Sequence, residues 1–306
     1  MPDPTEIVLT SSFITALGLF AITAIARKLL VSKTVSNAPF ELPLGNEDSP
    51  YQSPISNDLP PPLPAGKVPT WFYHPFDLFG LGVIFLVFFS LVIASVRTAR
   101  TADLVLDPNA LIFSIGFQFA TAGAVAFIVT RRAGLVEWLG LRWRSWPWVF
   151  LIAPGTVALM WLFFGTLQAT GYMKWMESLG VESVQDTVKL LQTSKDPLIL
   201  GLMAFAAVLA APVCEEIVFR GYFYPAAKKF AGPWVAGICS ALIFASAHGS
   251  LSALLPLFIF GGVLVFIYEK TGSLWAPIAV HFCFNGATVL VQLIARIYQI
   301  PLDPVQ

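Results

Sequence analysis

The chain has 306 residues, of which 57% are hydrophobic and only 12% are charged. Soluble domains carry roughly 25% charged residues, so this composition excludes an ordinary soluble protein and predicts a polytopic membrane protein. The formal net charge is zero, so no overall basic field favours nucleic acid as a partner, and we expect none.

The three cysteines, Cys214, Cys239 and Cys283, each stand alone within apolar runs. An odd, scattered set without a CxxC pair predicts neither a disulfide framework nor a thiolate zinc site. We interpret these cysteines as small core side chains.

The first apolar run, Ile7–Leu30, is preceded by acidic residues and followed by Arg27 and Lys28. A secretory signal would carry its positive charge before the apolar run, so we expect residues 1–34 to form an N-terminal membrane anchor helix. Residues 35–76 are rich in Pro, Ser, Asn and Asp, a composition that cannot bury a core, and this predicts a linker.

Residues 77–306 contain seven more apolar runs, most of them close to the roughly 20 residues that a membrane span needs. They are approximately Asp77–Val96, Ala110–Thr130, Trp146–Thr170, Leu198–Phe230, Pro233–His248, Leu251–Tyr268 and Leu274–Tyr298. The predicted fold is therefore all-α, a membrane domain that brings the total to about eight transmembrane helices. Charged residues among apolar ones in Gly171–Asp196 predict an amphipathic helix in the membrane interface.

Basic residues predict the orientation, because short loops rich in Lys and Arg stay in the cytoplasm. With the N-terminus outside, twelve of the 18 basic residues fall on the inner side. The six on the outer side are Arg97, Arg100, Lys174, Lys189, Lys195 and Arg296. We therefore expect an integral protein of a bacterial plasma membrane, surrounded by lipids, with both termini outside.

The span Leu198–Phe230 has Glu215, Glu216 and Arg220 in its middle. A charge at this depth costs several kcal/mol unless it is paired, faces a wet cavity or does chemistry. Glu216 and Arg220 are four residues apart with the acid first, which predicts an ion pair. Glu215 points about 100° away and is left as a free carboxylate. The alternative is a charge network that only locks helices together.

Further polar side chains in the last spans predict an intramembrane polar cavity. His248 shares a helical face with Phe244, and His281 shares one with Asn285, because each pair is four residues apart. Glu215 and His248 each lie about 15 residues, or about 22 Å, from the turn that joins their spans, so they are expected in one layer.

Pro212 lies just before the two glutamates. It lacks a backbone N–H, so it can bend the long helix and leave a carbonyl unpaired at this point.

Three motifs follow one another on successive spans: Glu215-Glu216-x-x-Phe219-Arg220-Gly221, Phe244-x-x-x-His248 and His281-x-x-x-Asn285. In these motifs the chain resembles the CPBP family, which includes CAAX prenyl endopeptidases, bacteriocin-immunity proteins and Abi-type proteins. The resemblance covers a core at residues 197–298 and implies an intramembrane protease with Glu215 as the general base. The other residues it implies are His248, His281 and Asn285 in the catalytic site, and Glu216, Arg220, Phe219 and Phe244 in support. The implied substrate is a membrane protein or peptide, cleaved near the C-terminus of a prenylated (CAAX-type), membrane-associated or hydrophobic chain.

Peptide hydrolysis needs a group that deprotonates water and donors for the tetrahedral oxyanion. Glu215 suits the base, and His248 can orient the water or protonate the leaving amine. His281 and Asn285 can donate to the oxyanion.

Neither a GxSxG elbow nor an HExxH motif occurs, which disfavours a serine hydrolase and the usual zincin arrangement. Because ligand spacing across three helices is not diagnostic of a metal site, we expect a glutamate mechanism without a metal or other cofactor. The alternative is a zinc enzyme with Glu215, His248 and His281 as ligands.

Two other classes remain open. A transporter could use Glu215, Glu216 and His248 as a proton relay, but the N-terminal half shows no internal repeat. A non-proteolytic immunity or scaffold protein could also carry the motifs without cleaving a substrate.

Overall fold

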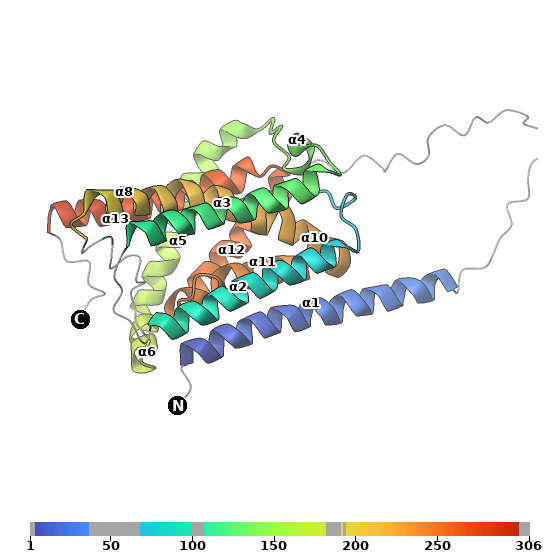
Figure 1. Cartoon of the computed structure of the whole chain (residues 1–306), viewed down its shortest axis with the longest axis horizontal. Coiled ribbons are helices and arrows are strands. Elements are labelled where there is room, and N and C mark those ends of the chain that lie inside the picture. The colour runs from blue at the N-terminus through green and yellow to red at the C-terminus, as the bar shows by residue number, and fades with distance from the viewer. Residues whose placement is uncertain (1–3, 37–67, 100–106, 182–190, 192–193, 300–306) are drawn as a thin grey trace, which may run out of the picture.

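The computed structural model describes residues 4–36, 68–99, 107–181, 191 and 194–299. Most of the predicted linker, at 37–67, and much of the predicted amphipathic segment, at 182–190 and 192–193, lie outside the described residues. The described part of the chain is helical and contains no strand (Figure 1). Its elements are α1 (Pro4–Ser36), α2 (Asp77–Ala99), α3 (Pro108–Thr130), α4 (Leu135–Trp138), η1 (Trp146–Trp148), α5 (Val149–Ala169), α6 (Tyr172–Ser178), α8 (Pro197–Phe205), η2 (Ala206–Ala210), α9 (Ala211–Glu215), η3 (Glu216–Phe223), α10 (Tyr224–Ala231), α11 (Pro233–Ser246), α12 (Leu251–Thr271) and α13 (Trp275–Ile297).

Seven helices within the described residues are long and apolar enough to cross a membrane, which confirms a polytopic all-α membrane protein. The one predicted span outside these seven, Pro233–His248, corresponds to α11, a shorter apolar helix of 14 residues. At about 1.5 Å per residue α11 rises only about 21 Å, less than the roughly 30 Å of a bilayer's hydrocarbon core. Helix α11 ends at Ser246, and a turn follows with Gly249 at a φ of +68°.

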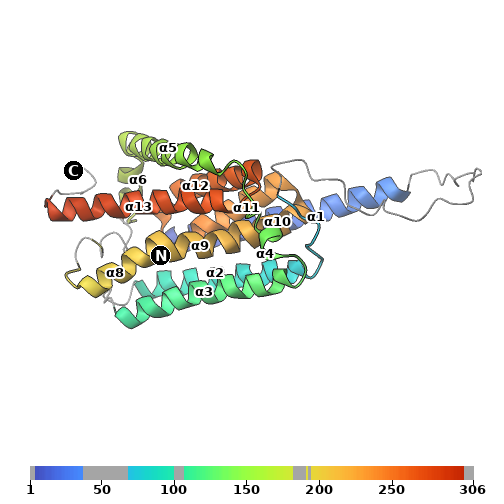
Figure 2. The same ribbon diagram turned by 90° about the horizontal axis from the view of Figure 1, so that it is seen from above.

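Elements α8, η2, α9, η3 and α10 form one continuous helical segment, Pro197–Ala231, which we call the long helix. It runs through the middle of the bundle, with α2 and α3 on one side and α13 and α5 on the other (Figure 2). The residues of the predicted core therefore hold a central position in the domain.

Helix α1 packs against α11, α10 and α2, so its first half is part of the bundle. Leu9, Phe13 and Ala16 on α1 are buried. The ring of Phe13 meets those of Phe85 and Phe89 edge-on, with centroids 5.6 and 5.5 Å apart.

The long helix departs from a regular α-helix at two places. The π-helical turn η2 ends two residues before Pro212, and a second π-helical segment, η3, begins directly after Glu215. Proline cannot donate to the helical ladder and its ring crowds the carbonyl four residues earlier, so a wider turn relieves this crowding. The two interruptions place the paired glutamates at a change of helical register.

The last residues of the predicted linker pack against the bundle. Phe72 and Tyr73 are buried, although Trp71 is exposed. The Tyr73 hydroxyl donates to the carbonyl of Gly221 at 2.6 Å, and the Trp138 indole N–H donates to the same oxygen at 2.8 Å. Burial raises the pKa of Tyr73 well above its ordinary value, so this hydroxyl stays a donor.

Asp77, the first residue of α2, is fully buried and joins three parts of the chain. Its carboxylate accepts hydrogen bonds from the Arg132 guanidinium at 2.6 Å, from the Tyr222 hydroxyl at 2.9 Å and from the His74 backbone N–H at 2.6 Å. This carboxylate ties the start of α2 to the end of α3 and to η3.

We predict that Gly80→Ala destabilises the protein, because a Cβ at Gly80 would lie 2.1 Å from the Tyr222 hydroxyl oxygen and displace it from Asp77. Overpacking of this kind costs about 1–3 kcal/mol. The matched control is Gly82→Ala on the same helix, where a Cβ would meet no described atom within 4 Å. Thermal unfolding in detergent should show a lower Tm for Gly80→Ala alone, and equal Tm values for the two variants would contradict the packing described here.

Candidate active site

Glu216, Arg220 and His281 form a buried polar cluster. The Arg220 guanidinium donates to Glu216 Oε1 at 2.9 Å, which confirms the predicted ion pair. His281 Nδ1 lies 2.9 Å from the same oxygen, and because a carboxylate accepts, this nitrogen donates. All three side chains are nearly inaccessible. The cluster links the long helix to α13.

Arg220 also binds the two helices that follow in the chain. A second nitrogen of its guanidinium donates to the carbonyl of Gly261 on α12 at 3.1 Å. The guanidinium carbon lies 4.3 Å from the ring centroid of Phe244 on α11, a cation–π contact. Phe219 packs edge-on against the same ring at 5.4 Å. Phe244 therefore covers the guanidinium, and Phe219 packs against Phe244.

Glu215 has a different environment from Glu216. It lines a cavity of about 350 Å³, whereas Glu216 is 0% exposed. Among the described residues no group forms a hydrogen bond with the buried oxygen Oε2 of Glu215. Oε2 of Glu216 likewise lacks a described partner, but its Oε1 is held by Arg220 and His281. Glu215 is thus the carboxylate that faces open space, as the helical spacing predicted.

His248 lines the same cavity from the turn after α11. Its Nδ1 lies 2.8 Å from the Phe244 carbonyl oxygen, and the two rings meet edge-on at 5.0 Å. A carbonyl oxygen only accepts, so Nδ1 carries the proton and Nε2 is the ring nitrogen left for the cavity. The structure therefore brings Glu215 and His248 together, as their equal distance from the turn predicted.

His281 contacts Glu216 and is not among the residues that line this cavity. Its ring packs edge-on against Phe244 at 5.9 Å and against Phe260 at 5.4 Å. These contacts fix the ring in one orientation, with Nδ1 toward Glu216.

Asn285 binds the long helix, a partner that the sequence did not predict for it. Its side-chain N–H donates to the carbonyl of Ala207 at 2.8 Å. In the π-helical turn η2 the N–H of Ala211 bonds the carbonyl of Ala206, so the next donor in the same register would be Pro212. Pro212 has no N–H, and the Asn285 amide satisfies the carbonyl that the proline leaves unpaired.

Four polar residues on the opposite side of the cavity were not predicted from the sequence. They are Ser95 on α2 and Ser114, Gln118 and Thr121 on α3. The three on α3 are spaced four and three residues apart, so they share one helical face. That spacing of polar residues within an apolar span is the feature of the sequence that could have predicted their place in the cavity.

The alternative zinc ligands are not assembled into a metal site. In the described parts of the chain no three His, Cys, Asp or Glu side chains are grouped as a metal ion would require. His281 directs Nδ1 to Glu216, away from the cavity that Glu215 and His248 line.

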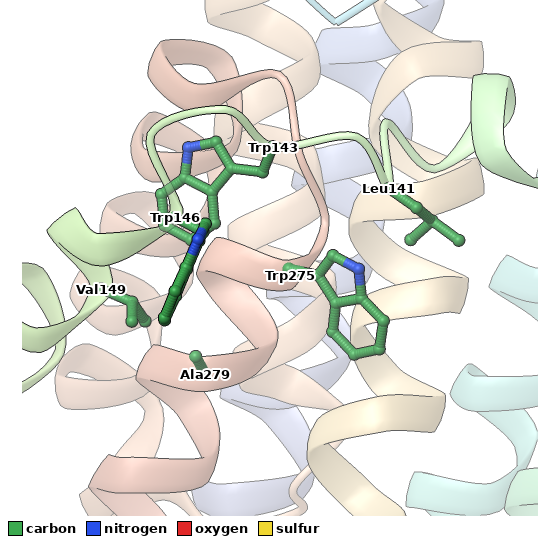
Figure 3. A pocket seen from close by; sticks show the side chains of 6 residues that line it. All are labelled: Leu141, Trp143, Trp146, Val149, Trp275 and Ala279. Atoms are coloured by element: carbon green, nitrogen blue, oxygen red, sulfur yellow. The ribbon is translucent and has the colours of Figure 1, made fainter.

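A second hollow, of about 370 Å³, lies beside the first turns of α13. The rings of Trp143 and Trp146 lie close together there, and Trp275 lies between them and Leu141 (Figure 3). None of the described residues that line this hollow has a titratable side chain.

Comparison with known proteins supports the motif resemblance over part of the chain. Residues 197–287 match the family model described as "Type II CAAX prenyl endopeptidase Rce1-like". "Putative membrane peptidase YdiL" of Bacillus subtilis (strain 168) is 33% identical over 92 residues, which cover 30% of this chain and 38% of that protein. No solved structure gives a significant match. The matched segment contains all three motifs, and the helices from α1 to α6 lie outside it.

We predict that Arg220→Ala strongly destabilises the fold. Removing one partner of a buried ion pair leaves an uncompensated charge and costs about 3–5 kcal/mol. Here the carboxylate of Glu216 would keep only His281. Arg144→Ala, which removes an exposed guanidinium, is the matched control. Thermal unfolding should give a Tm far below wild type for Arg220→Ala alone, and an unchanged Tm would refute a stabilising role for the cluster.

Proposed function

We propose that this protein is an intramembrane endopeptidase in which Glu215 activates the attacking water. One observation carries the proposal: of two adjacent buried glutamates, one is held by Arg220 and His281, and the other lines a cavity together with His248. The similarity to a prenyl endopeptidase family, and to a relative named as a membrane peptidase, supports the same reaction class.

In the proposed reaction a water molecule lies between Glu215 and His248. The carboxylate takes one proton of the water while His248 Nε2 accepts a hydrogen bond from the other. The hydroxide adds to the substrate carbonyl carbon to give a tetrahedral intermediate. Protonated Glu215 then delivers its proton to the amide nitrogen, the C–N bond breaks, and an acid and an amine are released.

The other predicted site residues act by positioning in this proposal. His281 and Arg220 hold Glu216, which fixes the segment that carries Glu215. Asn285 stabilises the π-helical turn before Pro212 through the Ala207 carbonyl. Each fixes the backbone next to the reacting carboxylate, and rigid support of this kind is what a precise site needs.

We propose a substrate that reaches the cavity from the membrane, either a prenylated CAAX-type C-terminus or another hydrophobic peptide. Besides its polar residues, the cavity is lined by the apolar side chains of Phe88, Leu91, Val92 and Phe117. The family description favours the prenylated class. An immunity or scaffold function is the second candidate, since the Glu216–Arg220–His281 cluster by itself would also serve to hold helices together.

We propose that both termini lie outside, in a bacterial plasma membrane. Arg144 and Lys174 are exposed and lie beyond opposite ends of α5, so they mark the two faces of the membrane domain. In intact cells a membrane-impermeant maleimide should label Lys174→Cys and not Arg144→Cys. Wild type is the control, because its three cysteines lie in apolar helices. Labelling of Arg144→Cys alone would invert the orientation.

Glu215→Gln should abolish peptide cleavage without unfolding the protein, because it removes the basic function and keeps the shape. The rate should fall at least about 100-fold, the usual contribution of general base catalysis. The measurement uses purified protein in detergent and a quenched fluorescent peptide with a farnesylated cysteine four residues from its C-terminus. Glu137→Gln, at an exposed glutamate on α4, is the matched control. Cleavage at the wild-type rate by Glu215→Gln would move the base elsewhere.

The same assay separates the zinc alternative. With a carboxylate base alone, a strong chelator should leave cleavage by the wild type unchanged. If Glu215 and the two histidines held zinc, chelation would inactivate the enzyme and added zinc would restore it.

A further inference from the structure

Helices α2 and α3 contribute four polar side chains, among apolar ones, to the lining of the cavity that contains Glu215. Ser114, Gln118 and Thr121 lie on one face of α3, and Ser95 faces the same space from α2. These helices are otherwise strongly apolar, and polar side chains inside membrane helices are costly and commonly functional. The position of these residues opposite the glutamate therefore indicates that a ligand binds in this cavity.

Gln118 differs from Thr121 in lacking a described hydrogen-bond partner for its side-chain oxygen. The Thr121 hydroxyl donates to the Phe117 carbonyl of its own helix at 2.8 Å. Gln118 Oε1, in contrast, is buried, and nothing in the described part of the chain donates to it. A buried acceptor without a donor is unfavourable, so its presence in the cavity that Glu215 lines indicates a donor supplied from outside the protein.

A peptide substrate supplies such a donor. Backbone N–H groups cannot stay unpaired in an apolar environment, and an extended peptide pairs none of its own. A primary amide matches a peptide unit, because its oxygen accepts from N–H and its NH₂ group donates to C=O.

We propose that Gln118 binds the backbone of the substrate, with Oε1 accepting the N–H of a residue next to the scissile bond. Gln118 and Ser114 then hold an extended segment across the cavity from Glu215. This inference rests on the proposed peptidase function, and it assigns to α3, outside the family match, the task of substrate binding.

The test is Gln118→Leu, which keeps the size of the side chain and removes the amide. Since the acceptor has no described partner, its removal should leave Tm equal to or above that of wild type. KM for the farnesylated quenched peptide should rise about tenfold, with kcat changed less than about twofold. Gln168→Leu, at an exposed glutamine on α5, is the matched control and should change neither.

Binding is measured separately from cleavage by fluorescence anisotropy of the same peptide in the Glu215→Gln background. Adding Gln118→Leu should raise Kd about tenfold, equivalent to about 1.4 kcal/mol. Peptides with one backbone N–H replaced by an ester oxygen identify the bonded group. One ester position should weaken binding to the Gln118 protein and have no effect on the Leu variant.

These outcomes separate the two proposals. Cleavage by the wild type with a Kd that Gln118→Leu does not change overturns this inference alone. A peptide that binds through Gln118 and is not cleaved overturns the peptidase function alone. Failure of the wild type both to bind and to cleave the peptide overturns both.

Discussion

A guanidinium that is 0% exposed among membrane helices must find its hydrogen-bond acceptors within the protein, and Arg220 finds one on its own helix and one on α12. Glu216 Oε1 and the Gly261 carbonyl accept its hydrogen bonds, and the ring of Phe244 covers its face. The same carboxylate holds His281. Helices α11, α12 and α13 therefore all contact the Glu216–Arg220 pair of the long helix, next to Glu215.

Irregular backbone in the long helix leaves carbonyl groups that bind neighbouring segments. The turn before Pro212 is π-helical, and the carbonyl that the proline leaves free is taken by Asn285 on α13. Farther along, the Gly221 carbonyl accepts from Tyr73 and Trp138. Backbone groups that a regular helix would pair internally thus become points of attachment for neighbouring segments. This is the usual condition for tolerating irregular backbone in a membrane.

The local part of this structure could be predicted from the sequence. The Glu216–Arg220 pair depends only on helical spacing within one element, and the spans follow from long apolar runs. The hydrogen bond between Asn285 and Ala207 joins residues 78 positions apart. It also depends on a π-helical register, which no pattern of residue types in the sequence predicts. Gln118 was visible as a polar residue in an apolar span, but its position opposite Glu215 is set by how α3 packs on the long helix.

The shortness of α11 bears on how the proposed hydrolysis obtains its water. A helix about 21 Å tall leaves a hydrophobic mismatch of about 9 Å against an ordinary bilayer. Lipids adjust to such a deficit by thinning, and thinning beside α11 would bring headgroups and water nearer to the turn at His248–Ser250. His248 stands in that turn and lines the cavity, so in the proposed reaction this end of α11 would give water the shortest path to Glu215.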